Sequence, residues 1–458
     1  MSIRLYNTLT RQKEEFEPIH KGKAGVYACG PTVYWYAHIG NLRSFLFADV
    51  LRRVLVHSGL DVKFVMNITD VGHLTDDGSD GEDKMIVAMK REGKTAYEIA
   101  GFYTEAFMKD AERLNILSAD EYPRATKHIQ EQIDMVAALE KNGYTYSTSD
   151  GVYFDTSKLE NYGRLSGQSI EEKKAGARVD VGEKKSPTDF ALWKFSSDGP
   201  QRDMEWDSPW GKGFPGWHIE CSAMSVKYLD ATFDIHTGGV DHIAVHHENE
   251  LAQTQGALGK LQSNIWMHGD FLTVDGGKMS KSLGNLYTVD DLIEKDYDPI
   301  DFRYFVLGAH YRTQLNFTFD ALTAARNALS RLRVIVRAWD KPAVGCAEFE
   351  ERFDEAIFDD LNTPQALAIL WELVDSDNSS SAKAHSLLQF DEVLGLGLKS
   401  YVSIPLDVPD SVQLLVDERE QARKDKDWSL SDELREKIAV SGFIVEDTDS
   451  GPILKQKL

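Results

Sequence analysis

Two strand patterns with a helix pattern between them constrain the fold of this chain more than any other feature of its sequence. Gly25–Ala28 is a short apolar run that leads into a turn, and Val62–Ile68 is a second apolar run. Between them, apolar residues recur at helical spacing, at Leu42, Leu46, Val50 and Val54,. A strand, a helix and a strand in this order place two parallel strands side by side. The sequence therefore predicts an α/β fold built on a Rossmann-like parallel sheet.

The start of the predicted helix carries a short polar motif, His38-Ile39-Gly40-Asn41. Ligands of parallel sheets bind beyond the carboxyl ends of the strands, and His38 lies at that edge. A helix N-terminus offers unpaired N–H groups and a partial positive charge, so a phosphate is expected there. No GxGxxG motif follows the first strand. The pattern therefore favours a mononucleotide over a dinucleotide.

A second motif, Lys278-Met279-Ser280-Lys281-Ser282, lies far downstream and precedes Leu283-Gly284-Asn285. A Lys/Ser loop can bring two ammonium groups onto a triphosphate as charge moves to the leaving pyrophosphate. Taken alone, each motif is an ordinary turn or surface loop. Their occurrence together, in this order, predicts an enzyme that activates a carboxylate with ATP.

Length and composition describe a chain of several domains. At 458 residues it exceeds one core, and its hydrophobic fraction of 42% comes without a long apolar run, so no membrane span is expected,. The N-terminus lacks a secretory signal and the chain holds only 3 cysteines, which favours the cytoplasm,. A net charge of -23 argues against non-specific nucleic-acid binding,. A structured RNA could still use local cations, at Arg326, Arg331, Arg333, Arg337, Arg419, Arg423, Lys424 and Lys426,.

The changes of pattern along the chain predict six segments. Two halves of the catalytic domain flank a connective insertion, and a linker region with the Lys/Ser loop follows. A helical bundle comes next, and a small mixed α/β domain ends the chain, with one charged helix over Ser411–Val440 and a short strand pattern,. The expected bounds are 1–125, 126–210 (insertion), 211–266, 267–318 (linker), 319–402 (bundle) and 403–458.

Distant residues of the types that bind zinc form a candidate metal site. They are Cys29 after the first strand, Cys221, and the pair His246 and Glu250, which face the same way on a helix,. On that helix His247 is expected to point elsewhere. His236 and His218 lie nearby as candidate partners of these ligands, and Cys346 is expected to be a free thiol,. Close Cys-x-x-Cys pairs and a His-Glu-x-x-His motif are both missing,. From spacing alone, buried free cysteines beside a surface His/Glu cluster explain these residues equally well.

With these residues in hand, the chain resembles cysteinyl-tRNA synthetase, a family of class I aminoacyl-tRNA synthetases. His38–Asn41 is similar to the HIGH signature, Lys278–Ser282 matches the KMSKS loop, and Gly216–Met224 resembles the cysteine-pocket segment of the family. The resemblance implies that ATP and magnesium, L-cysteine and its tRNA are the ligands, and that the protein is a monomer. It implies catalytic and ATP-binding roles for His38, Asn41, Lys278, Ser280 and Lys281, one zinc ion on Cys29, Cys221, His246 and Glu250, and a cysteine pocket of Gly30, Thr69, Trp217 and Asp241.

The chain departs from the family pattern in two places. Asn41 replaces the second histidine of the signature, so this position can donate a hydrogen bond but cannot become cationic,. The acidic segment 72–83 has no assigned role. Three other interpretations stay open: a cysteine ligase that joins activated cysteine to an amino-sugar acceptor, a non-catalytic RNA-binding protein, and a zinc hydrolase. The long helical C-terminal region favours tRNA over an amino sugar.

Overall fold

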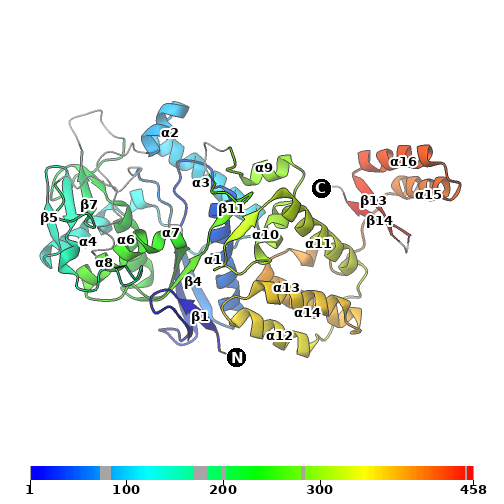
Figure 1. Ribbon diagram of the computed structural model, residues 1–458, viewed down its shortest axis with the longest axis horizontal. Helices are drawn as coiled ribbons and strands as arrows, with labels where there is room; N and C mark the ends of the chain where they lie inside the picture. Colours follow the sequence, from blue (N-terminus) through cyan, green and yellow to red (C-terminus); the bar gives the residue numbers. More distant parts are fainter. Residues whose placement is uncertain are drawn as a thin grey trace. The chain divides into compact units, whose positions relative to one another are not determined.

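A computed structural model describes residues 2–72, 84–168, 183–196, 203–279, 284–448 and 451–456 (Figure 1). The chain divides into two compact units. The first consists of 1–289, 306–318 and 354–367, and the second of 290–305, 319–353 and 368–458. Among the described residues, no helix has both the length and the apolar character needed to cross a membrane. Most of the acidic segment 72–83, and Ser280 to Leu283 of the Lys/Ser loop, lie outside the described residues.

The centre of the first unit is a four-stranded parallel sheet in the order β10-β9-β3-β4. Its strands are β3 (Lys23–Ala28), β4 (Asp61–Met66), β9 (Phe233–Gly239) and β10 (Ser263–Gly269). Helix α1 (Ile39–His57) connects β3 to β4. The predicted strand–helix–strand unit is confirmed, and its four periodic residues Leu42, Leu46, Val50 and Val54 are all buried. The Rossmann-like α/β prediction is therefore correct.

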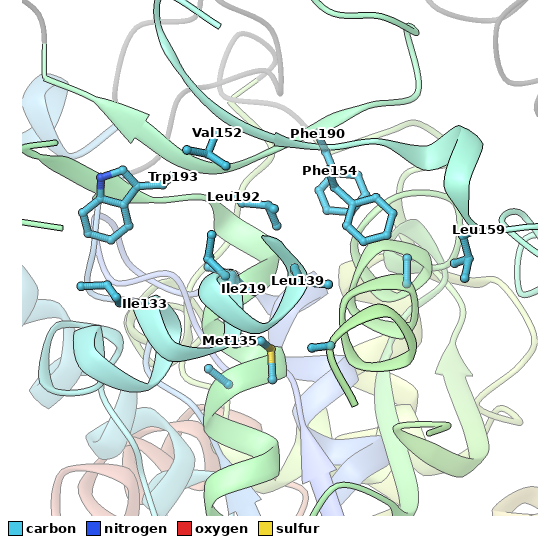
Figure 2. Close-up of a cluster of buried hydrophobic side chains, with 14 of the residues drawn as sticks. Ile133, Met135, Leu139, Val152, Phe154, Leu159, Phe190, Leu192, Trp193 and Ile219 are labelled. Atoms are coloured by element: carbon cyan, nitrogen blue, oxygen red, sulfur yellow. The ribbon is translucent and has the colours of Figure 1, made fainter. Parts of the chain in front are cut away.

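A second, antiparallel sheet lies between β4 and β9 in the sequence, in the order β5-β6-β7-β8. Figure 2 shows its buried side chains facing helices that carry Ile133, Leu139 and Ile219. Ile133 and Leu139 lie on α4 (Ile129–Lys141) and Ile219 lies on α6 (Trp217–Leu229), while α8 (His246–Leu258) adds Ala252 and Ala257 to the same core. The strands are β5 (Thr145–Ser147), β6 (Gly151–Phe154), β7 (Phe190–Phe195) and β8 (Gly213–Pro215). Because α6 and α8 also carry candidate metal ligands, the packing of this core holds those ligands in position.

The remaining elements of the first unit are short strands and peripheral helices. Two hydrogen-bonded strand pairs are formed, β1 with β2 and β11 with β12. The bounds are β1 (Arg4–Asn7), β2 (Gln12–Glu15), α2 (Lys84–Glu92), α3 (Ala96–Arg113), α7 (Val240–Ile243), β11 (Leu272–Val274) and β12 (Leu315–Phe317). Strand β11 precedes the Lys/Ser loop by only a few residues.

The second unit is mainly helical. Its helices are α9 (Val289–Glu294), α10 (Pro299–Leu307), α11 (Phe319–Arg337), α12 (Ala347–Phe358), α13 (Thr363–Asp375), α14 (Ser380–Leu394), α15 (Asp410–Lys424) and α16 (Trp428–Val440), of which α9, α10, α12 and α13 extend in part into the first unit. An antiparallel pair, β13 (Phe443–Thr448) and β14 (Gly451–Gln456), ends the described chain.

The prediction of one charged helix over Ser411–Val440 is wrong, because the chain breaks there into α15 and α16. Lys426 has a φ of 60°, a left-handed conformation that interrupts a helix,. The Asp427 side chain then accepts a hydrogen bond from the Leu430 N–H and caps α16,. Asp427, in the Lys-Asp-Lys-Asp sequence of this turn, is a residue type that favours helix N-caps, and a prediction from helical spacing alone does not use it,.

Two of the cations proposed for RNA contact are structural instead. Arg333 is buried and forms an ion pair with Asp298 at 3.0 Å. Arg419 is 2% exposed and donates two hydrogen bonds to the Asp447 carboxylate. Neither guanidinium is available to a phosphate, so these two members of the predicted cationic faces are wrong.

The packing of α4 against α8 can be tested by mutation. Leu139 is fully buried, and its Cδ2 atom lies 2.8 Å from where a Cβ on Gly256 of α8 would stand. We expect Leu139→Ala to lower the free energy of unfolding by about 2 to 5 kcal/mol, through lost burial and the cavity left behind. Urea unfolding measures this loss, with exposed Lys141→Ala on the same helix as the control. Equal losses in the two variants would contradict this assignment of the core.

Candidate metal centre and nucleotide site

Two of the predicted pocket residues meet where β3 and β4 end. An added Cβ on Gly30 would lie 1.7 Å from the backbone oxygen of Asn67, so only glycine fits there,. The Gly30 N–H donates to Asn67 Oδ1, and Asn67 Nδ2 donates to Thr69 Oγ1 at 3.0 Å. Thr69 itself is buried. Gly30 and Thr69 are therefore neighbours, directly beside Cys29.

The four predicted metal ligands converge from three elements. Cys29 follows β3, Cys221 lies on α6, and His246 and Glu250 lie on α8. One donor atom from each lies within 4.8 Å of the other three, and all four residues are buried. A tetrahedral ion with bonds of roughly 2.0 to 2.3 Å needs donor atoms about 3.3 to 3.8 Å apart. Glu250 Oε1 lies 3.8 Å from Cys29 Sγ and 3.1 Å from His246 Nε2, so the cluster fits such an ion.

The expectation that His247 points away from this cluster is wrong. Its Nε2 atom lies 3.2 Å from Cys29 Sγ, because Cys29 approaches α8 from the side that His247 faces. Cys29, His236, His247 and Glu250 consequently form a second, overlapping set of close donor atoms. On its other side, His247 Nδ1 lies 2.7 Å from His268 Nε2. Helical spacing compares residues of one helix only and cannot predict a contact from another element.

His236 and His218 contact the predicted ligands, as the sequence suggested. His236 Nε2 lies 3.0 Å from Glu250 Oε2, and His218 Nδ1 lies 2.9 Å from His246 Nδ1. Gln262 adds a hydrogen bond to Glu250 Oε2. Partners of this kind orient metal ligands, so the orientations of His246 and Glu250 are fixed by neighbouring side chains,. Cys346 is a free thiol elsewhere in the chain, as expected.

The charges in the cluster favour a cation. Burial would raise the pKa of Glu250, but His236 and His246 hold it below its ordinary value. The hydrogen bond with Cys29, together with the neighbouring His246, lowers the pKa of the Cys221 thiol despite burial. Burial would lower the pKa of His246, but Glu250 and Cys221 raise it to about 10. Both shifts favour the ionised forms of Glu250 and Cys221, which are the forms that bind a metal,.

Trp217 and Asp241 come from the two short segments beside the metal centre. The Trp217 ring lies 4.4 Å from the His246 ring, centroid to centroid. The Asp241 side chain lies close to the backbone of Gly239: a Cβ added to Gly239 would lie 2.3 Å from Asp241 Oδ1. A ring of His242, next to Asp241, lies 5.0 Å from that of His246. Both predicted pocket residues are therefore on segments that border His246.

His38 and Asn41 form a reciprocal cap at the start of α1. The Asn41 N–H donates to His38 Nδ1, and the His38 N–H donates to Asn41 Oδ1, both at 3.2 Å,. Burial lowers the pKa of His38, which keeps the ring neutral. Because Nδ1 accepts a hydrogen bond, the proton of the neutral ring lies on Nε2. The cap also holds Asn41 Oδ1, which leaves its NH₂ group as the donating end.

Two contacts tie the Lys/Ser loop segment to this helix start. A Cβ on Gly40 would lie 2.1 Å from the Cε atom of Met279, so Gly40 leaves the space in which Met279 lies. The Ile39 N–H donates to the Tyr287 backbone oxygen. Lys278 is also described, with its backbone oxygen bonded by Asn285. The two motifs, far apart in the sequence, are neighbours, while the predicted roles of Ser280 and Lys281 fall outside the described residues.

Arg43 is a residue of this site that the sequence reasoning missed. It is 3% exposed, and its guanidinium donates to the backbone oxygens of Asp270 and Phe271, just before β11, and of Thr313. Burial lowers its pKa to about 10, so it stays charged at neutral pH. Arg43 thereby fixes α1 to the strand that leads into the Lys/Ser loop. The sequence did contain a signal for this role, because Arg43 is a charged residue within a predicted helix whose neighbours are mainly apolar.

Comparison with known families identifies three regions of the chain. A family model described as the tRNA synthetases class I (C) catalytic domain matches residues 15–327. A DALR domain matches 352–399, and a cysteinyl-tRNA ligase anticodon binding domain matches 406–451.

Curated relatives match nearly the full length of the chain. Cysteine--tRNA ligase 1 of Burkholderia lata is 51% identical, over 98% of this chain and 96% of the relative. Cysteine--tRNA ligase of Treponema denticola is 44% identical, over 98% of each.

Solved structures share the fold at low sequence identity. Methionyl-tRNA synthetase of Mycobacterium tuberculosis, in complex with methionyl-adenylate, is 16% identical with a TM-score of 0.56, over 83% of this chain and 91% of that one. LeuRS agnB2 of Agrobacterium radiobacter, in a ternary complex with tRNA and LeuAMS, is 11% identical with a TM-score of 0.58, over 84% and 85%.

The contact between Gly40 and Met279 can be tested by proteolysis. We expect Gly40→Ala to displace the Met279 side chain, because the new methyl group takes the space of Cε. Cleavage by trypsin after Lys278 should become severalfold faster, while the melting temperature changes little, since Met279 is flexible. Gly101→Ala on α3 is the control, because nothing lies near its added Cβ. Unchanged cleavage after Lys278 in Gly40→Ala would contradict the contact.

Proposed function

The chain belongs to the cysteine–tRNA ligase family of class I aminoacyl-tRNA synthetases, and from this premise we propose how its residues attach cysteine to tRNA. The interpretation as a ligase that uses an amino sugar is not supported. Relatives named cysteine–tRNA ligase match 98% of the chain, and the anticodon-binding model matches its C-terminal region. The observation that carries the choice of amino acid is the buried donor set of Cys29, Cys221, His246 and Glu250.

The first step joins the cysteine carboxylate to the α-phosphorus of ATP and expels pyrophosphate. A carboxylate is already ionised at neutral pH, so no general base is needed. Catalysis then depends on alignment and on stabilising charge at the phosphates, to which magnesium is brought with ATP. We assign these tasks to His38 through its Nε2–H, to the Asn41 NH₂ group, and to Lys278, Ser280 and Lys281. In the second step a ribose hydroxyl at the 3′ end of tRNA attacks the carbonyl carbon of the adenylate; an ester bond forms, the bond to the phosphate breaks, and AMP leaves.

We propose that the donor set of Cys29, Cys221, His246 and Glu250 holds one zinc ion. Two sulfurs, an imidazole nitrogen and a carboxylate oxygen form a ligand set typical of zinc. Bound zinc would supply a soft Lewis acid that favours the thiolate of cysteine over the hydroxyl of serine. The polar partners of these ligands, His236 and His218, hold the set in place. His247 Nε2 lies close enough to Cys29 to compete as a ligand, so a metal titration of variants must separate the two sets.

The remaining pocket residues are proposed to orient the amino acid. Asp241 is assigned to the substrate ammonium, as a carboxylate near the helix that carries His246. Trp217 lies against His246 and would close the side-chain pocket. Gly30 and Thr69 shape the edge beside Cys29, where a side chain on Gly30 would collide with Asn67.

The rest of the chain is proposed to serve the tRNA. We keep the domain bounds proposed from the sequence, with the helical bundle over 319–402 and the anticodon-binding domain over 403–458. Two alternatives, an RNA-binding protein without catalysis and a zinc hydrolase, explain less of the chain. Neither accounts for both signature motifs together with the donor set. We further propose that the enzyme acts as a monomer in the cytoplasm.

The zinc proposal is tested by exchange of pyrophosphate into ATP. With cysteine, exchange should be fast and should fail after treatment with a zinc chelator; with serine it should be lower by more than the roughly 200-fold that a methylene difference allows. Cys221→Ser should lose zinc, measured by metal analysis, and should lose cysteine binding while keeping most of the ATP affinity. Cys346→Ser, a free cysteine outside the cluster, is the control. Stoichiometric zinc in Cys221→Ser, or serine activity equal to that with cysteine, would refute the assignment.

Asn41 allows its capping role to be separated from its proposed catalytic role. Asn41→Asp keeps an oxygen acceptor for the His38 N–H, and an acid in the first turn suits the helix, so the melting temperature should be maintained,. The NH₂ donor is lost, and an anion replaces it beside the phosphates. We expect pyrophosphate exchange to slow by about 100-fold or more.

Asn41→His, which can accept through Nδ1 and donate through Nε2, is the matched control and should restore exchange to within a few-fold of the original rate. Fast exchange in Asn41→Asp would show that the amide contributes only the cap.

A further inference from the structure

A ledge of aromatic rings borders the segment that leads into His38. Trp35 and Tyr36 lie just before the signature, and Phe102 and Tyr103 lie on α3, which follows α2 in the first unit (Figure 1). The Tyr36 ring lies 5.0 Å from that of Tyr103 and 6.1 Å from that of Phe102. The Trp35 ring lies 6.0 Å from that of Tyr103. We refer to these four residues as the aromatic ledge.

The ledge is not closed over as a core would be. Phe102 is 43% exposed, and the nearby Tyr97 on the same helix is 52% exposed. Trp35 and Tyr36 are half-buried, whereas Tyr103 is buried and supports the other rings. Large rings with accessible faces are unusual on the surface of a soluble protein and commonly mark an interaction site. The ledge therefore has ring surface that a flat partner can stack on.

Cations lie over the same rings. The Arg91 guanidinium lies 3.8 Å from the Trp35 ring centroid, and the Lys94 ammonium lies 4.8 Å from that of Phe102. Residues 84–94 hold four cations, Lys84, Lys90, Arg91 and Lys94, and one acid, Glu92, for a net charge of +3. The whole chain has a net charge of -23. This surface is thus locally opposite in sign to the protein that carries it.

We propose that the aromatic ledge, with Arg91 and Lys94, binds the unpaired nucleotides at the 3′ end of the tRNA acceptor arm. Exposed rings stack on unpaired bases, and cations beside them take up phosphates; a duplex, whose bases are already stacked, would use the cations alone. The location supports this partner, since Tyr36 is two residues before His38, and the unpaired end must reach the adenylate made there. The proposal rests on the function in tRNA charging proposed above.

Two variants test the ledge without touching the adenylation site. Phe102→Ala removes an exposed ring, and Lys94→Ala removes a cation whose side chain is 43% exposed and which needs no repacking. Lys109→Ala, an exposed lysine farther along α3, is the matched control. Three quantities are measured for each: pyrophosphate exchange, which needs no tRNA; the single-turnover rate of cysteine transfer from preformed adenylate; and the Kd for tRNA with and without its unpaired 3′ nucleotides.

The ledge variants should keep pyrophosphate exchange within about twofold of the unmodified enzyme. Transfer should slow, or the Kd for intact tRNA should rise, by about tenfold for each, which corresponds to one lost base stack or phosphate contact. Removing the unpaired nucleotides from the tRNA should weaken binding to the unmodified enzyme and to Lys109→Ala, but much less to Phe102→Ala, because the contact is already lost.

Several outcomes would overturn the inference. Unchanged transfer and Kd in both variants would exclude the ledge as a tRNA surface and would leave a protein partner as its occupant. An equal fall in pyrophosphate exchange and transfer would show that the rings support the adenylation site instead. If the unmodified enzyme exchanged pyrophosphate with cysteine but charged no tRNA, the proposed function itself would fail, and the ledge variants would not be needed to show it.

Discussion

The structure around the metal centre depends on one fully buried carboxylate, that of Glu250. A buried anion without partners is strongly destabilising, so its surroundings must neutralise and hydrogen-bond it. His246 and His236 do so at 3.1 and 3.0 Å, and Gln262 adds a donor. These partners come from α8 itself, from β9 and from the segment before β10. The neighbouring strands β9 and β10 thus bring His236 and Gln262 to the Glu250 carboxylate, where they hydrogen-bond it. Cys29 and Cys221 lie in the same cluster.

The start of α1 depends on a different kind of contact, in which side chains bind backbone groups and a missing side chain leaves room for a neighbouring segment. The cap between His38 and Asn41 fixes the ring of His38, and the missing side chain of Gly40 admits Met279. Arg43, two residues after Asn41, holds the carbonyls that precede β11. Within one helical turn and a half, the start of α1 therefore orients His38 and Asn41 and also positions the segment that enters the Lys/Ser loop. A change of sequence in this turn acts on both at once.

The strand–helix–strand unit was predictable from local spacing, and the clustering of Cys29, Cys221, His246 and Glu250 was predictable from their residue types together with the family resemblance. The helix expected over Ser411–Val440 failed on a local signal, the turn at Lys426 and Asp427, whereas the other errors each concerned a contact between different elements. His247 faces Cys29 only because β3 ends beside α8. Arg333 and Arg419 seem to be solvated helix residues until Asp298 and Asp447 are placed next to them. Arg43 looked like an interruption of an apolar face, and its carbonyl partners lie more than 200 residues away.

The segment that follows β3 connects two parts of the candidate site. Cys29 follows β3 directly, and His38, the N-cap of α1, comes nine residues later, so a single short segment connects the candidate metal ligands to the signature motif. That segment includes Trp35 and Tyr36, whose rings pack on α3. The residues proposed for selection of the amino acid, for its activation and for the approach of the tRNA end thus lie on one stretch of chain. Asn41 belongs to the same stretch, and its cap with His38 fixes the orientation of its NH₂ group, the one donor that this side chain offers,.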